Sequence, residues 1–200
     1  MKQIMSAESG ADEGIDWAKL SAAWETSLPS DYMAFMTDYG AGEISGAFSI
    51  VCPQKPGVTP SDVSGMAHET ANARELWQPA SAPSGAGTGK VPVIAWGVSA
   101  GADIVCWLTE NSDPDQWPVA VLGRHTKALW KTYECGMVEF LCRLFHAEFD
   151  ESPLSDDTLL GNASPQFLNY REIDRCWGAG VDPWTGEPDP FAGFEFDLRD

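Results

Sequence analysis

The sequence is short of positive charge. Its 200 residues include 12 Lys and Arg against 30 Asp and Glu, which gives a formal net charge of -18 at pH 7. A chain with so few cations is repelled by the phosphate backbone of nucleic acids and by anionic lipid surfaces. We therefore expect no nucleic acid and no membrane among its partners, and the charge favours a basic protein as the partner.

Long apolar runs and paired cysteines are also missing. No stretch approaches the ~20 apolar residues that a membrane helix needs, and residues 1–14 contain no apolar run typical of a secretory signal. The five cysteines form no Cys-x-x-Cys pair, and three of them lie in strongly apolar segments. These absences predict a cytoplasmic protein whose cysteines are reduced and mostly buried.

Large apolar side chains, by contrast, are abundant. The chain contains nine Trp and nine Phe on a composition that is 44% hydrophobic. This excludes a disordered acidic polypeptide, because the apolar groups are enough to form a core. At this length we expect one domain, with room for an appendage.

The apolar pattern predicts both helices and strands. Helical spacing is found over residues 15–26, 28–40, 61–78 and 137–149. Strand-like runs occupy residues 46–52, 91–96, 103–108, 117–122 and 128–133. Short polar connections join the last four runs, which favours an antiparallel meander. The pattern indicates an α+β domain, with a mostly antiparallel sheet packed by helices.

Two of these helices carry start or stop signals. The helix over residues 28–40 has Pro29 and Asp31 in its first turn, and Gly40 can adopt the left-handed conformation that ends a helix. The helix over residues 61–78 has Ser61 as its expected N-cap.

The character of the chain changes near residue 150. Residues 147–200 contain 13 acidic and 3 basic side chains, a balance of -10. We expect a flexible leader over residues 1–14, a domain over 15–150, and an acidic C-terminal extension over 151–200 that packs on the domain. The side chains expected to hold the extension in place are Phe167, Leu168, Tyr170, Trp177, Trp184 and Phe191. Trp177 and Trp184 are the better candidates for partial exposure.

One short motif matches a serine hydrolase. Residues 97–101 (GVSAG) have the G-x-S-x-G pattern of a nucleophile elbow and follow an expected strand. Ser99 would be the nucleophile, and the acid and base candidates downstream are Asp113 or Asp150 and His125 or His146. An elbow leads into a helix, however, whereas residues 102–108 have strand composition. We interpret the motif as a hairpin turn and keep the hydrolase as a remote alternative.

Phosphate-binding and metal-binding motifs are incomplete. Residues 87–90 (GTGK) lack the Ser or Thr and the helix that would complete a phosphate-binding loop. Residues 146–148 (HAE) copy the His-x-Glu of zinc deaminases, but only the lone Cys176 follows. Two acidic pairs lie in turn-like contexts without a calcium-loop pattern: Asp113 with Asp115, and Asp156 with Asp157. We predict no metal, no cofactor and no catalytic site.

A series of aromatic and turn segments follows the order of a known family. The first are Trp24, residues 28–35 (LPSDYMAF) and residues 39–42 (YGAG). The later ones are residues 96–97 (WG), 101–107 (GADIVCW), 113–119 (DPDQWPV), Trp130, Tyr133 and residues 139–141 (EFL). In their order and spacing, residues 17–149 resemble the SUKH superfamily, the Smi/Knr-like proteins.

The resemblance implies an α+β fold and, in bacteria, an immunity protein that binds and neutralises a cognate toxin, frequently a nuclease. The yeast relative instead regulates cell-wall synthesis. The family has no catalytic residues to carry over, and a long segment after residue 151 departs from its minimal domain. The matching positions are expected to be scaffold: Leu28, Tyr32, Phe35, Gly40, Trp96, Trp107 and Trp117.

We therefore expect a non-enzymatic bacterial immunity protein whose acidic face covers the basic surface of a toxin. A SUKH-type scaffold or regulatory protein that binds a cellular partner is the alternative. The candidate contact residues are Asp113, Asp115, Asp156, Asp157, Trp184 and Asp189.

Overall fold

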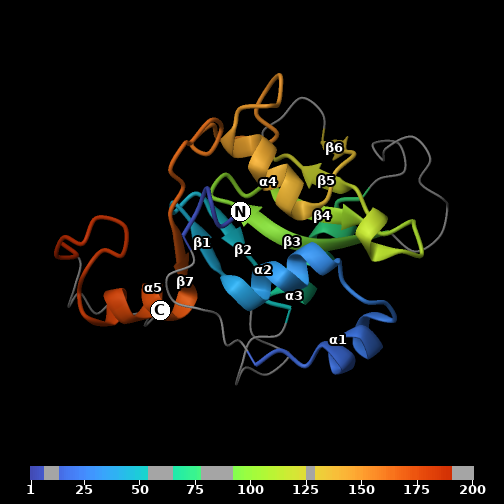
Figure 1. Ribbon diagram of the computed structural model, residues 1–200, viewed down its shortest axis with the longest axis horizontal. Coiled ribbons are helices and arrows are strands. Elements are labelled where there is room, and N and C mark those ends of the chain that lie inside the picture. The colour runs from blue at the N-terminus through green and yellow to red at the C-terminus, as the bar shows by residue number, and fades with distance from the viewer. Residues whose placement is uncertain (7–13, 54–64, 78–91, 125–128, 191–200) are drawn as a thin grey trace, which may run out of the picture.

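The computed structural model describes residues 1–6, 14–53, 65–77, 92–124 and 129–190. The helices are α1 (Trp17–Trp24), α2 (Ser30–Asp38), α3 (Met66–Glu75), α4 (Met137–Phe145) and α5 (Tyr170–Gly178), with a short 3-10 helix η1 (Pro114–Gln116). The strands are β1 (Gly42–Ile44), β2 (Phe48–Ile50), β3 (Val93–Ser99), β4 (Ile104–Leu108), β5 (Val119–Leu122), β6 (Trp130–Tyr133) and β7 (Phe167–Asn169). They form one antiparallel sheet in the order β6-β5-β4-β3-β2-β1-β7 (Figure 1), which confirms the expected α+β class.

The central meander follows the sequence prediction. Strands β3 to β6 pair antiparallel with their neighbours in chain order. Successive side chains point to opposite faces, so that Trp96 and Trp107 join one apolar cluster while Ala95 and Cys106 join the other. Because both faces are covered, β3, β4 and β5 are almost continuously apolar, whereas β6 includes Lys131 and Thr132 and only its first residue is buried.

Helices provide the cover on both faces of the sheet. Helices α2 and α4 contribute to the larger cluster through Tyr32, Phe35, Met36, Met137, Phe140, Leu141, Leu144 and Phe145. Helix α3 contributes to the smaller cluster through Ala73, with Leu76 and Trp77 packed beside it. All seven positions of the expected scaffold are buried: Leu28, Tyr32, Phe35, Gly40, Trp96, Trp107 and Trp117.

Helix α2 connects distant parts of the chain through the first-turn acid that the sequence indicated. Asp31 Oδ2 accepts a hydrogen bond of 3.0 Å from the backbone N–H of Val138 and so caps the start of α4. The N-cap of α4 is Gly136, where a Cβ would lie 2.9 Å from the same oxygen. At the other end of α2, Gly40 has a φ of 78°, as expected for a left-handed stop.

Two expected boundaries are wrong. The strand expected over residues 46–52 is only β2, because Ser45 and Gly46 have positive φ values and form a turn between β2 and an unexpected strand β1. Helix α3 begins at Met66, later than expected, with Gly65 in extended conformation as its N-cap. Ser61, the expected N-cap, lies outside the described residues.

The expected flexible leader is corrected for residues 1–6. Met5 is 1% exposed and belongs to the larger cluster. The hydroxyl of Tyr39 donates a hydrogen bond of 2.7 Å to the Met5 carbonyl. A buried phenol needs such an acceptor, and the Met5 side chain adds apolar contact, so the first residues pack on the core.

Residues beyond 150 extend the sheet. Strand β7 pairs with β1 from Gly42 opposite Asn169 to Ile44 opposite Phe167. The buried Asn169 side chain accepts from the N–H of Arg171, which caps α5, and donates to the Tyr39 carbonyl. This places α5 beside β7, at the opposite edge of the sheet from β6 (Figure 1).

Candidate functional site

Asp113 and Asp115, two of the candidate contact residues, flank the start of η1. Both are exposed. The Asp113 carboxylate accepts from the N–H of Asp115 at 3.1 Å, and Asp115 Oδ1 accepts from the N–H of Ser30 at 2.6 Å. Asp115 therefore holds the first turn of α2, a structural role that the sequence did not indicate.

Asp156 and Asp157 lie in the loop between α4 and β7. Both side chains are exposed. Hydrogen bonds from the hydroxyl and the backbone N–H of Thr158 lower the pKa of Asp156, which keeps this carboxylate charged well below neutral pH. The two residues therefore present negative charge on an ordered turn.

That turn is anchored by a buried carboxylate, Asp103. Its Oδ2 accepts from the Ser99 hydroxyl and the Ser155 N–H, each at 2.7 Å. Its Oδ1 accepts from the Arg124 N–H at 3.0 Å and the Ser155 hydroxyl at 2.5 Å. Sequence reasoning placed Asp103 only at the start of a strand. An acid directly before the apolar run of residues 104–108 was the available signal, because a buried carboxylate must be hydrogen-bonded.

Trp184 and Asp189 belong to the turn and return that follow α5. Val181 and Pro188 form an isolated antiparallel bridge, and the Asp189 N–H donates to the Gly180 carbonyl at 2.8 Å. Trp184 is half-buried, as expected. Its indole lies against Gly46, because a Cβ placed on that glycine would be 3.2 Å from the indole Nε1. It packs against the β1–β2 turn and is only partly available to a partner.

The six candidate contact residues do not form one patch. Asp103 directly precedes β4 and holds the turn that carries Asp156, whereas η1 follows the other end of that strand. A five-residue strand spans roughly 17 Å. Trp184 packs at the turn between β1 and β2, and β3 separates these strands from β4.

Ser99, the nucleophile of the elbow motif, is a buried turn residue. Its hydroxyl donates to Asp103, and Asp103 N–H donates back to Ser99 Oγ at 3.0 Å. The chain continues into β4 and not into a helix. Gly97 of the motif leaves room for the Phe48 ring, because a Cβ on residue 97 would lie 2.4 Å from Phe48 Cζ. The expected hairpin turn is confirmed.

The other short motifs bring no ligand set together. His146 ends α4 and its Nδ1 lies 2.8 Å from the Cys142 carbonyl oxygen. Within the described ranges, no group of three or more His, Cys, Asp and Glu side chains is arranged around a metal position. His125 and residues 87–90 lie outside those ranges. All five cysteines are thiols without disulfides, and three of them are buried.

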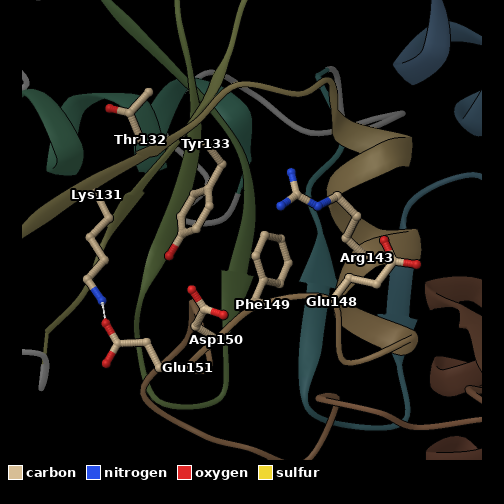
Figure 2. Close-up of a pocket in the computed structure, with 8 residues that line it drawn as sticks. All are labelled: Lys131, Thr132, Tyr133, Arg143, Glu148, Phe149, Asp150 and Glu151. Carbon is tan, nitrogen blue, oxygen red and sulfur yellow. Dashed lines mark hydrogen bonds and ion pairs between the residues drawn. The ribbon is translucent and has the colours of Figure 1, made fainter.

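A hollow of about 550 Å³ lies between β6 and the residues that follow α4. It is lined by Lys131, Thr132, Tyr133, Arg143, Glu148, Phe149, Asp150 and Glu151. Figure 2 shows the Tyr133 hydroxyl and the Asp150 carboxylate pointing into the space beside the Phe149 ring, with Lys131 paired to Glu151. Burial, followed by the charge of Glu151, raises the pKa of Tyr133 to about 12. Sequence reasoning assigned no role to this hollow.

Helix α5 exposes an aromatic side chain at its end. Tyr170 and the buried Ile173 lie on one side of the helix, and Trp177 falls on the same side one turn later. Trp177 is 46% exposed, more than any other large hydrophobic side chain in the described ranges. The expected partial exposure of this residue is confirmed. Its expected part in holding the extension stays a prediction.

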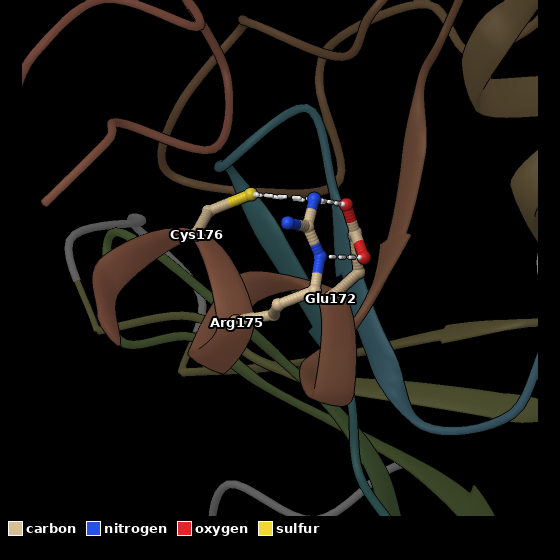
Figure 3. Close-up of polar contacts among 3 residues, drawn as sticks. All are labelled: Glu172, Arg175 and Cys176. Carbon is tan, nitrogen blue, oxygen red and sulfur yellow. Dashed lines mark hydrogen bonds and ion pairs between the residues drawn. The ribbon is translucent and has the colours of Figure 1, made fainter. Parts of the chain in front are cut away.

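The outer side of α5 is polar. Arg175 makes two hydrogen bonds of 2.8 and 2.5 Å with the carboxylate of Glu172, and the Cys176 sulfur lies 3.8 Å from one oxygen of that carboxylate (Figure 3). The hydrogen bond from Arg175 lowers the pKa of Glu172, and the same contact raises the pKa of Arg175. The positive charge of Arg175 is thus matched within the helix, and Asp174 remains exposed beside it.

Comparisons with known proteins identify no relative. No family model, no curated protein and no solved structure matches this chain. None of the helices in the described part of the chain has the length and apolarity needed to cross a bilayer.

Proposed function

We propose that this chain is a SUKH-type binding protein, and specifically an immunity protein that neutralises a basic cognate toxin. The observation that carries the proposal is an anionic segment built into the fold. Residues 147–200 contain 13 acidic and 3 basic side chains, and their described part is attached through β7 and through the Asp103–Ser155 hydrogen bonds. A charged segment held in place in this way presents a fixed surface to a partner.

The mechanism is occlusion of the toxin's own binding surface. Negative potential accelerates encounter with a basic protein, and a few desolvated aromatic contacts slow dissociation. Trp177 is the aromatic contact best placed for this, because it is exposed on the same helix as the exposed Asp174. A stable complex would bury on the order of 1,600 Å².

Replacement of Trp177 tests this arrangement. Trp177→Ala should weaken binding of the toxin encoded beside this protein by roughly tenfold or more, because an interface tryptophan often contributes about 2 kcal/mol. Surface plasmon resonance with purified proteins measures the change, and Gln116→Ala, at an exposed and uncharged residue of η1, serves as the control. Unchanged affinity in Trp177→Ala would remove Trp177 from the interface.

Two other outcomes would redirect the proposal. A specific complex with a cellular protein, in place of a toxin, would favour the scaffold or regulatory alternative. Labelling of the wild-type protein by a covalent serine probe, lost in Ser99→Ala, would contradict the non-enzymatic assignment.

A further inference from the structure

The hollow beside β6 has acids that the fold does not use. The carboxylates of Glu148 and Asp150 are exposed, and neither makes a hydrogen bond or an ion pair within the described ranges. Lys131 pairs with Glu151, and the Arg143 guanidinium lies 4.6 Å from the centre of the Phe149 ring. The lining has three carboxylates, those of Glu148, Asp150 and Glu151, against these two cations, so the net charge of the hollow is negative.

Aromatic side chains form the wall next to these acids. The rings of Tyr133 and Phe149 meet edge to face with centroids 5.1 Å apart, and Phe140 contacts both. The Tyr133 hydroxyl points toward Asp150 across the open space (Figure 2). An aromatic wall with carboxylates at its rim attracts cations, because ring faces and anions both carry negative potential.

The contact of Arg143 indicates which cation fits best. A guanidinium already lies over one side of the Phe149 ring in this protein. Guanidinium is planar, stacks on aromatic rings and can donate to two carboxylates at once, whereas ammonium is compact and strongly hydrated. The volume of the hollow, about 550 Å³, is within the range of ligand pockets.

We propose that this hollow is a binding site for the arginine side chain of a peptide or protein ligand, with Glu148, Asp150 and the Tyr133 hydroxyl as its polar contacts. The site lies at the β6 edge of the sheet, away from α5 and Trp177 at the β7 edge, although Glu148 and Asp150 belong to the acidic segment 147–200 on which the proposed function rests. Rigid β6 and α4 position the aromatic wall, and the loop after α4 supplies the acids.

Nuclear magnetic resonance titration tests the site without knowledge of a natural ligand. The full chain, labelled with ¹⁵N, is titrated with N-acetyl-L-argininamide, with its neutral citrulline analogue and with N-acetyl-L-lysinamide. The arginine probe should cause saturable shifts at the amides of Lys131–Tyr133 and Glu148–Glu151. The citrulline analogue should cause none there, and the lysine probe should bind more weakly.

Variants separate the site from general attraction to an acidic protein. Asp150→Asn and Glu148→Gln should each weaken the arginine probe roughly two- to fivefold, as expected for exposed charge pairs. Asp157→Asn, an exposed acid outside the hollow, should leave the affinity unchanged. The site is overturned if shifts at these amides fail to saturate, occur equally with citrulline, or survive unchanged in Asp150→Asn. Tighter binding of lysine would overturn the preference for arginine.

Discussion

At the scale of single residues, Asp103 has the most consequential contacts. Two of its four hydrogen bonds come from backbone N–H groups, that of Ser155 on Oδ2 and that of Arg124 on Oδ1. In Asp103→Asn one oxygen becomes an NH₂ group, and whichever oxygen is replaced, one backbone N–H loses its acceptor. Hydroxyls can rotate to adapt, but an N–H cannot.

Asp103→Asn should therefore lower the free energy of unfolding by about 3 kcal/mol, the cost of an unsatisfied buried donor together with loss of charge-assisted hydrogen bonds. Urea denaturation followed by tryptophan fluorescence measures it. Asp157→Asn is the matched control and should change stability by less than about 0.5 kcal/mol. Equal stability of the two variants would show that Asp103 does not hold the turn.

Tyr133 predicts how stability depends on alkaline pH. Its pKa is raised from 10.0 to about 12, chiefly by burial and then by Glu151. Between these values the unfolded chain releases the phenolic proton while the folded chain keeps it, so stability falls as pH rises. The stabilisation that comes from this difference in pKa is complete below pH 10 and lost above about pH 12. Tyr133→Phe should flatten the fall over this range in urea denaturation at several pH values, and an unchanged slope would contradict the assignment.

At the scale of elements, the pairing of β7 with β1 depends on the absence of a side chain at Gly42. A Cβ at that position would lie 2.2 Å from the Leu168 carbonyl oxygen and 2.8 Å from Asn169 Cα. The two strands are also joined at their ends, by Tyr170 N–H to Ala41 and Ser45 N–H to Gln166.

Gly42→Ala should separate β7 from the sheet while the central meander stays intact. Hydrogen exchange at the amides of Ser45 and Tyr170 should accelerate at least roughly tenfold, which corresponds to ~1.4 kcal/mol of local stability. Gly178→Ala is the control, because no atom lies within 4 Å of a Cβ there. Protection that is equal in both variants would mean that β1 does not require glycine.

Elements with strong local signals were predictable, and those made by distant contacts were not. The apolar runs of β3, β4 and β5 and the apolar stripe of α4 specify their own structure. β1 was missed because its three residues, GEI, have no periodicity to detect. β7 is equally short and exists through its pairing with β1. The tertiary cap of α4 by Asp31 required knowledge of two helices at once.

At the scale of the whole molecule, the apolar core and much of the charge lie in different parts of the chain. The core, formed mainly by residues 17–149, is apolar on both faces of the sheet. Much of the -18 net charge lies in the residues that follow. Composition was therefore sufficient to predict an acidic surface. It could not predict that the six chosen contacts lie in separate places, or that Asp115 is tied to α2, since both depend on the path of the chain.

Association with a basic partner should depend strongly on salt. Surface charges separated by more than about 8 Å are screened at physiological ionic strength. The association rate constant should fall by at least roughly tenfold between 20 and about 500 mM NaCl, with a smaller change in the dissociation rate. Stopped-flow fluorescence of the tryptophans measures the association rate constant. An association rate constant that does not change with salt would contradict electrostatic steering.

Co-expression with a candidate toxin, taken from a gene next to that of this protein, tests the central claim most directly. Growth of cells that produce the toxin is measured with and without this protein, with soluble expression of both checked by immunoblot. The proposed neutralisation predicts that cells producing both proteins grow as well as cells producing neither. Continued killing in the presence of soluble, folded protein would contradict it.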